Sequence, residues 1–144
     1  MKGFEPNYQE KIGILITNLG TPDNPDPKSL RKYLKQFLSA KRVVDYNRLL
    51  WWLILNVIIL NVRPRKSAKL YESIWTDKGS PLLVNMQSIV KKLQPRNEGV
   101  QIQLGMRYGN PSIEEALNYF KNQNIYKILV LPLYPQAGSP TNSS

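Results

Sequence analysis

Arg107 and Tyr108 stand side by side where the sequence changes from the pattern of a strand to that of a helix. Before them, apolar residues at every second position predict a strand over residues 99–106 with one buried face: Val100, Ile102, Leu104 and Met106. After them, Ser112 and Glu115 have the spacing of a capping box that starts a helix. Residues 107–110 are therefore predicted to be a strand-to-helix loop, and in parallel sheets such loops lie at the edge where ligands bind. The alternative is a solvated Arg107 beside a packing Tyr108.

The composition narrows the chemistry that the chain itself can perform. The 144 residues include no cysteine and no histidine. Disulfides, thiolate metal sites and cysteine nucleophiles are therefore excluded, and the side chain best suited to proton transfer near neutral pH is missing. The first ten residues lack the apolar stretch of a signal peptide, so we expect a cytoplasmic protein. Because 42% of the residues are apolar, we also expect a packed core.

The excess positive charge is concentrated in one segment. Of the twenty Lys and Arg residues, eleven fall within residues 28–69, where Asp45 is the one acid, and the chain has a net charge of +10. Such a field favours an anionic partner, which is a phosphate, a lipid headgroup or a ligand carboxylate. The alternative is a helix over residues 28–42 with a lysine-rich, solvated face. The eleven cations are Lys28, Arg31, Lys32, Lys35, Lys41, Arg42, Arg48, Arg63, Arg65, Lys66 and Lys69.

The spacing of apolar residues predicts an α/β protein with a parallel sheet. Asp26 is predicted to cap a helix that Pro27 begins, and Ser80 is predicted to cap another that Pro81 begins. The predicted elements are strands at 11–20, 99–106 and 126–136 and helices at 28–42, 49–60, 65–75, 81–93 and 112–122.

Residues 49–60, LLWWLILNVIIL, are apolar at all but one position. A helix of this length rises about 18 Å, whereas the hydrocarbon core of a bilayer is about 30 Å thick, so the segment is too short to span a membrane. One interpretation is a helix buried in the protein core, which is the more common case. The other is an interfacial helix anchored by Trp51 and Trp52. The flanking Arg48 and Arg63 fit the interfacial version.

Five motifs in the same order along the chain resemble those of ferrochelatases, the enzymes that insert ferrous iron into a porphyrin to make haem. They are NLGTP (18–22), RPRKSAKLYESIW (63–75), GSPL (79–82), MRYGNPS (106–112) and LPLYPQ (131–136). The resemblance implies a chelatase-like (Rossmann-like) three-layer α/β domain over residues 1–136, with a lip helix at about 47–62. It also implies that the domain is incomplete, that the polar tail 137–144 departs from the family pattern, and that a second domain is absent.

The resemblance also assigns roles to single residues. A porphyrin is an apolar disc with two carboxylates on one edge, so its site needs an apolar slot with cations and hydroxyls at one rim. The resemblance places Leu19 against the macrocycle, two cations and Ser80 on the propionates, Tyr71 near that rim, and the Arg-Tyr pair at the interior of the site near the metal path. The substrate-binding residues that it implies are Leu19, Arg63, Lys66, Tyr71, Ser80, Arg107 and Tyr108.

Porphyrin metallation removes two pyrrole protons, so a base must lie near the ring nitrogens. In the family, the essential histidine and glutamate lie in a second half, and no catalytic residue of that kind is expected in this chain. The resemblance implies no resident metal or cofactor, because ferrous iron and protoporphyrin IX are both substrates. We therefore expect a ferrochelatase-like function in haem biosynthesis, with the isolated 144-residue chain inactive in iron insertion.

Three alternatives to an iron chelatase stay open at this point. They are a non-catalytic tetrapyrrole-binding or split-partner protein, a chelatase for cobalt, and a basic nucleic-acid-binding domain. The last is the weakest, because the basic segment surrounds an apolar stretch and contains no recognition motif, so we expect no nucleic-acid partner. The cations around residues 49–60 instead predict contact with a membrane surface, at the inner face of the membrane.

Overall fold

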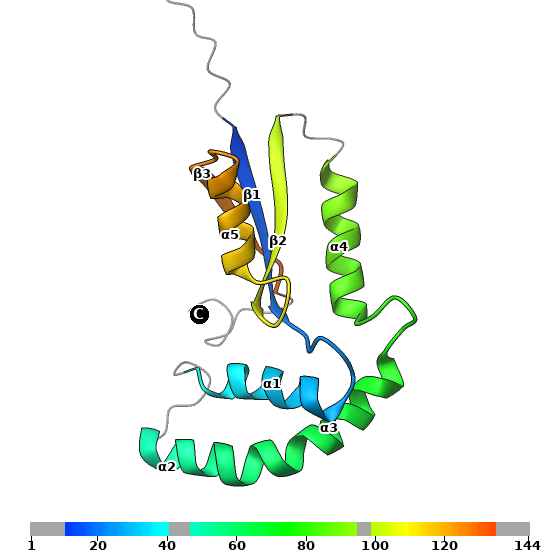
Figure 1. Cartoon of the computed structure of the whole chain (residues 1–144). Helices are drawn as coiled ribbons and strands as arrows, with labels where there is room; N and C mark the ends of the chain where they lie inside the picture. The colour runs from blue at the N-terminus through cyan, green and yellow to red at the C-terminus, as the bar shows by residue number, and fades with distance from the viewer. Residues whose placement is uncertain (1–10, 41–46, 95–98, 135–144) are drawn as a thin grey trace, which may run out of the picture.

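The structure, a computed structural model, describes residues 11–40, 47–94 and 99–134. Its sheet has three parallel strands in the order β2-β1-β3: β1 at Ile12–Gly20, β2 at Val100–Tyr108 and β3 at Lys127–Pro132. Helix α4 (Pro81–Leu93) packs on one face and α5 (Ile113–Asn122) on the other (Figure 1). The predicted three-layer α/β fold is therefore confirmed. The predicted domain end at 136 and the tail 137–144 lie outside the described residues.

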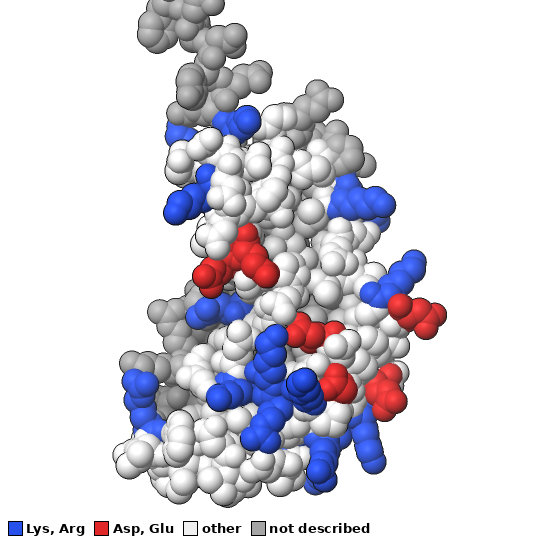
Figure 2. Space-filling view, in the orientation of Figure 1, with Lys and Arg blue, Asp and Glu red and all other residues white. Residues whose placement is uncertain are grey.

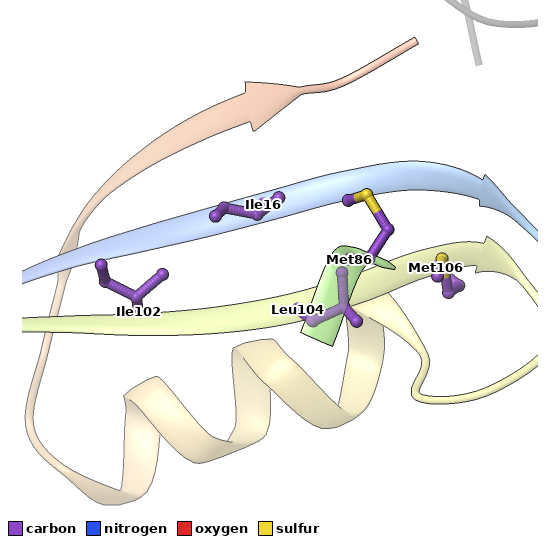
Figure 3. Packing of buried hydrophobic residues seen from close by; sticks show 5 residues of the cluster. All are labelled: Ile16, Met86, Ile102, Leu104 and Met106. Atoms are coloured by element: carbon purple, nitrogen blue, oxygen red, sulfur yellow. The ribbon is translucent and has the colours of Figure 1, made fainter. Parts of the chain in front are cut away.

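The face under α4 holds the larger core. Ile16 pairs with Leu104 across β1 and β2, and both side chains point to this face. Figure 3 shows the cluster over the two strands, with one methionine entering from α4; its buried members are Ile16, Met86, Ile102, Leu104 and Met106. The alternation predicted for residues 99–106 is confirmed, because every second residue of β2 contributes to this core.

The opposite face is covered by α5, which packs Phe120 against Leu15. A Cβ at Gly13 would lie 2.9 Å from the Phe120 ring, so the strand needs glycine there to admit the ring. The predicted capping box begins the helix. The hydroxyl of Ser112 accepts from the backbone amide of Glu115 at 3.1 Å, and the Glu115 carboxylate accepts from the backbone amide of Ser112.

The third strand is covered only in part, because Ile128 is the β3 residue that packs against the cluster under α5. The next three side chains of β3 stay largely open to solvent: Leu129 is 55%, Val130 53% and Leu131 39% exposed. Strands of a parallel sheet usually have both faces covered. The helices therefore cover mainly β1 and β2, and residues 129–131 of β3 form an open apolar edge.

Helix α1 (Pro27–Leu38) lies below the carboxyl ends of the strands (Figure 1). Asp26 caps it as predicted, since its carboxylate accepts from the backbone amides of residues 28 and 29. The helix buries Leu30, Tyr33 and Leu38. It ends at Leu38, so the predicted extent to residue 42 is too long: residues 39 and 40 are not helical, and residues 41 and 42 lie outside the described part of the chain.

A continuous helical run follows where the sequence predicted two separate helices. It consists of α2 (Arg48–Leu53), the π-helical segment η1 (Ile54–Ile59) and α3 (Leu60–Ile74). Pro64 lies inside α3 and does not end it. A proline inside a helix forfeits one backbone hydrogen bond. Packing against α1 offsets that loss here, because Leu60, Pro64 and Ala68 are buried at i, i+4 and i+8 along the helix that contacts α1.

The apolar segment 49–60 is buried on one side only, so the interpretation as a fully buried helix is wrong. Leu55 and Leu60 pack with Leu38, and the indole Nε1 of Trp51 donates to the carbonyl of Leu38 at 2.8 Å. Six other apolar side chains of the segment are exposed: Leu49, Leu50, Trp52, Leu53, Val57 and Ile58. We call these six residues the lip face. None of the helices described is long and apolar enough to cross a membrane.

Candidate functional site

Four of the seven predicted site residues lie around the carboxyl end of β1: Leu19, Tyr71, Ser80 and Tyr108. Asn18, which is buried, donates from Nδ2 to the carbonyl of Leu133 at 2.8 Å and accepts from the amide of Leu19 at 2.7 Å. This side chain joins β1 to the segment after β3 and fixes the backbone from which Leu19 projects. Leu19 itself is half-buried, so part of its surface is open to a ligand.

A buried pair of hydroxyls joins this strand end to α4. Oγ1 of Thr21 donates to Oγ of Ser80 at 2.8 Å, and both residues are almost fully buried. Ser80 occupies the N-cap position that the sequence predicts, but its side chain makes no capping hydrogen bond. The hydroxyl accepts from Thr21 instead, because the side chain points into the protein toward β1.

Two tyrosines connect the helices below the sheet to the same strand end. The Tyr33 hydroxyl donates to the carbonyl of Gly20 at 3.3 Å, and the Tyr71 hydroxyl is its hydrogen-bonding neighbour. Burial raises the pKa of Tyr33 far above its ordinary value, and the neighbouring phenols of Tyr71 and Tyr108 add to the shift. Burial raises the pKa of Tyr71 as well. Both phenols therefore stay protonated at neutral pH.

Arg107 and Tyr108 belong to the end of β2, so the prediction that they lie in a loop is wrong. The strand extends to residue 108 because Tyr108 pairs in register with Gly20. Tyr108 is 4% exposed, and its ring meets that of Phe37 edge-on at 5.3 Å, which confirms it as a packing residue. Its hydroxyl has no hydrogen-bond partner among the described residues. The Arg107 side chain is exposed, with Cζ 5.4 Å from the Tyr108 ring centroid.

The two cations predicted to bind the propionates lie on α3, away from the hydrogen bonds and ring contacts around the ends of β1 and β2. Arg63 and Lys66 are both exposed. They share one face of the helix with Leu70 and Ile74, because the four positions follow the spacing i, i+3, i+7 and i+11. We call these four residues the rim stripe. The structure thus brings Leu19, Tyr71, Ser80 and Tyr108 around residues 20 and 21, while Arg63 and Lys66 stand on the neighbouring helix.

Lys and Arg side chains gather in the lower half of the face shown in Figure 2, over α1 and α3, with several acidic side chains beside them. Asp23 is paired with one of these cations. Oδ2 of Asp23 accepts from Nζ of Lys32 at 2.9 Å, and this hydrogen bond lowers the pKa of Asp23, with a further contribution from Asn110. Within the described ranges, no group of three His, Cys, Asp or Glu residues lies together. The site as described therefore attracts anions and offers no carboxylate cluster for a metal ion.

Sequence reasoning missed the residues that support the predicted ones. Thr21, Tyr33 and Gln36 all contact the strand ends through side-chain hydrogen bonds. The sequence gave no sign that the Tyr33 hydroxyl reaches Gly20. Thr21 lies within the NLGTP motif, and that motif was the one signal available for it.

Comparison with known proteins gives one consistent result. The sequence profile of the ferrochelatase family matches residues 11–144, past residue 136 where the motifs described above end. The ferrochelatase of Thioalkalivibrio sulfidiphilus is 55% identical over 140 residues, which cover 94% of this chain and 38% of that protein. Those of Alcanivorax borkumensis and Nitrosomonas europaea are 51% and 53% identical, and the matches cover 41% and 39% of them. The chain therefore spans about two fifths of the length of these curated relatives.

Proposed function

The chain belongs to the ferrochelatase family, and we propose that it supplies part of the site at which ferrous iron is inserted into protoporphyrin IX. The observation that carries the proposal is the rim stripe, in which two exposed cations are followed along one helix face by two exposed apolar residues, Leu70 and Ile74. Protoporphyrin IX has the same division, since two carboxylates lie on one edge of an otherwise apolar disc. The stripe and the disc are therefore complementary in charge and polarity.

Each part of the rim stripe has a matching part in the ligand. The guanidinium of Arg63 presents parallel N–H donors that can pair both oxygens of a carboxylate, whereas the ammonium of Lys66 acts as a point charge. Leu70 is 71% and Ile74 57% exposed, and covering them with a macrocycle removes apolar surface from water. Tyr71, adjacent in sequence, keeps its phenolic proton and is available as a donor near the same rim.

We propose that this chain binds and orients the porphyrin and does not itself deprotonate it. Its 144 residues include no histidine. Burial raises the pKa of Tyr33 and Tyr71, so both phenols keep their protons at neutral pH and neither can accept one from the porphyrin. Iron enters the reaction as a substrate. We expect the isolated chain to leave the fluorescence of protoporphyrin IX unchanged when ferrous iron is added without oxygen, and metallation well above the protein-free control would contradict this part of the proposal.

Porphyrin titration with matched arginine variants tests the binding site. Arg63→Ala is expected to weaken binding of protoporphyrin IX by about 1–3 kcal/mol, the range for a lost hydrogen bond to a charged group. Arg65→Ala is the control, because Arg65 is also exposed on α3 but lies off the rim stripe. Its affinity should stay within about twofold of the unsubstituted chain, since surface substitutions away from such contacts are usually near neutral.

The dimethyl ester of protoporphyrin IX separates carboxylate recognition from general affinity. The ester lacks the charges that Arg63 is proposed to meet, so Arg63→Ala and the unsubstituted chain should bind it equally. Equal losses for Arg63→Ala and Arg65→Ala, or a loss that persists with the ester, would show that the rim stripe does not hold the propionates. A thermal melt of each variant identifies losses that come from unfolding.

We also propose that the lip face rests on a membrane surface, with the protein otherwise in the cytoplasm. The support is the exposure of six apolar side chains on one helix side, with Trp52 61% exposed, and the presence of Arg48 and Arg63 at either end. A tryptophan with an apolar body and a polar N–H suits the headgroup region, and flanking cations suit anionic lipids.

Vesicles of anionic lipid test this second proposal through tryptophan fluorescence. A blue shift is expected at low salt, and it should weaken as salt rises because the Debye length falls to about 10 Å at 0.1 M. Leu53→Glu should abolish the shift. Leu129→Glu is the matched control, because Leu129 on β3 is as exposed as Leu53 but lies outside the lip face. No shift at low salt, or equal losses in both variants, would contradict membrane contact through α2 and η1.

A further inference from the structure

The turn after β2 is tied to the first half of the chain by long-range polar contacts. The amide of Gly109 donates to Oε1 of Gln36 at 3.0 Å, and Nδ2 of Asn110 donates to Oδ1 of Asp23 at 2.8 Å. The other carboxylate oxygen of Asp23 accepts from Nζ of Lys32 at 2.9 Å. The partners are 73 and 87 residues apart in sequence, so tertiary structure alone creates these contacts. We call Asp23, Gln36, Gly109 and Asn110 the loop clamp.

Close backbone packing lies beneath these side-chain bonds. Gly109 has a φ of +84°, and a Cβ built there would lie 2.3 Å from the carbonyl oxygen of Thr21. Gly20 has a φ of +117°, and its Cβ would lie 1.7 Å from the carbonyl oxygen of Tyr108. The turn and the segment after β1 therefore touch backbone to backbone. This backbone contact is too close for the turn after β2 to shift relative to the end of β1, and the hydrogen bonds of the loop clamp lie above it.

The loop clamp fixes the backbone directly after Arg107 and Tyr108. The ring of Tyr108 is also in contact with the ring of Phe37, which follows Gln36 in α1. The cation of Arg107 lies 5.4 Å from the centroid of this fixed ring. An aromatic face attracts a cation, so a fixed ring restricts where the guanidinium rests. A side chain that is already restricted loses less entropy when it meets a ligand.

We propose that Gln36 and the Asp23–Asn110 pair are positioning residues, which fix the end of β2 so that Arg107 is preorganised toward a porphyrin bound at the strand ends. The proposal rests on the porphyrin-binding function proposed above. The clamp residues need not touch the ligand. They act through the backbone of residues 107–110, and the effect of removing them must therefore depend on Arg107.

Exchanging the two members of the Asp23–Asn110 pair tests the geometry. Asn110→Asp sets two carboxylates against each other, so exchange of the Gly109 amide, followed by NMR, should accelerate by about tenfold or more as local opening becomes easier. In the double variant Asp23→Asn with Asn110→Asp, the amide donates from the opposite side and the hydrogen bond returns. Exchange should then recover to within about twofold of the unsubstituted chain.

Porphyrin affinity tests the positioning role itself. Asn110→Asp should weaken binding of protoporphyrin IX by about three- to tenfold, less than the loss of a direct hydrogen bond to a charged group, because the clamp acts only through Arg107. The exchanged pair should recover the affinity. In an Arg107→Ala background, Asn110→Asp should have no further effect, because the side chain that the clamp positions is gone. The loss should persist with the dimethyl ester, in contrast to that of Arg63→Ala, because Arg107 is expected to face the interior of the site.

Two controls separate positioning from charge and from unfolding. Asn118→Asp introduces the same charge at an exposed position of α5 and should change neither exchange at Gly109 nor porphyrin affinity. Gln36→Ala removes one hydrogen bond from an exposed side chain. It provides a milder test, with the same dependence on Arg107, if Asn110→Asp does not fold.

Each outcome decides between the alternatives. Unchanged exchange at Gly109 in Asn110→Asp would overturn the clamp. An affinity loss that is as large without Arg107 as with it would overturn the positioning role. If no variant binds porphyrin while exchange follows the predicted pattern, the proposed function fails and the clamp stands as a purely structural device.

Discussion

Removing the hydroxyl of Ser80 should destabilise the chain through Thr21 rather than through the helix that Ser80 begins. Thr21 is 3% and Ser80 4% exposed, so in Ser80→Ala the Thr21 hydroxyl is left without its acceptor where water does not reach. An unsatisfied buried donor costs about 1–3 kcal/mol. Loss of a capping bond contributes nothing, because Ser80 makes none.

A double-mutant cycle tests this reasoning. Thr21→Val removes the donor at constant shape and should cost about 1–2 kcal/mol, because the Ser80 hydroxyl is then unpartnered. The double variant replaces both hydroxyls and should cost less than about 1 kcal/mol, well below the sum of the single variants. The coupling energy should therefore be at least about 1 kcal/mol in favour of the double variant.

The measurement is urea unfolding followed by tryptophan fluorescence, with the midpoint shifting at constant slope. Ser73→Ala is the control, since that hydroxyl is exposed and bonds to the carbonyl of Leu70 within its own helix, and its cost should stay below about 0.5 kcal/mol. Additive costs in the double variant, or a Ser80→Ala chain as stable as the unsubstituted one, would refute the assignment of Ser80 as a partner of Thr21.

Three further outcomes follow from the same strand ends. Gly20→Ala should prevent folding or cost more than about 4 kcal/mol in thermal unfolding, because its Cβ would lie 1.7 Å from the Tyr108 carbonyl oxygen. Burial raises the pKa of Tyr33, so the folded state keeps the phenol neutral. The free energy of unfolding should therefore fall above about pH 10, where the same phenol ionises in the unfolded chain. In Tyr33→Phe, the denaturant midpoint should fall less steeply with pH over that range. The hydrogen bond from Lys32 lowers the pKa of Asp23 below its ordinary 3.8. This carboxylate therefore stabilises the fold above that pH, and its contribution is lost as the pH falls further. In Asp23→Asn, the free energy of unfolding should decrease less as the pH is lowered through this range.

Local patterns were sufficient for most of the elements. The alternation of Val100, Ile102, Leu104 and Met106 predicted a strand and its buried face, and the spacing of Ser112 and Glu115 predicted the start of α5. Each of these patterns spans only a few residues, and the interactions that it predicts, strand burial and helix capping, also form between residues close in sequence. The ordered motifs likewise indicated the ferrochelatase family, which the comparisons then showed.

Predictions failed where a distant part of the chain supplies the deciding contact. Pro64 was expected to lie between two helices, but packing of α3 against α1 keeps the helix continuous. Residues 107 and 108 were expected in a loop, but pairing of Tyr108 with Gly20 extends β2 to include them. The cap expected from the Ser80 side chain is absent because Thr21, 59 residues away in sequence, binds the same hydroxyl.

By itself, the sequence determined the class of fold, the order and faces of its elements, and the residue types that can meet an anionic, apolar ligand. Tertiary structure decided which side of residues 49–60 is buried, which hydroxyls are engaged, and that Gln36 and Asp23 reach the turn after β2. The reason is physical. Periodicity records how a segment divides its own surface between core and solvent, whereas the partner of a polar side chain depends on which distant backbone the fold brings within about 3 Å of it.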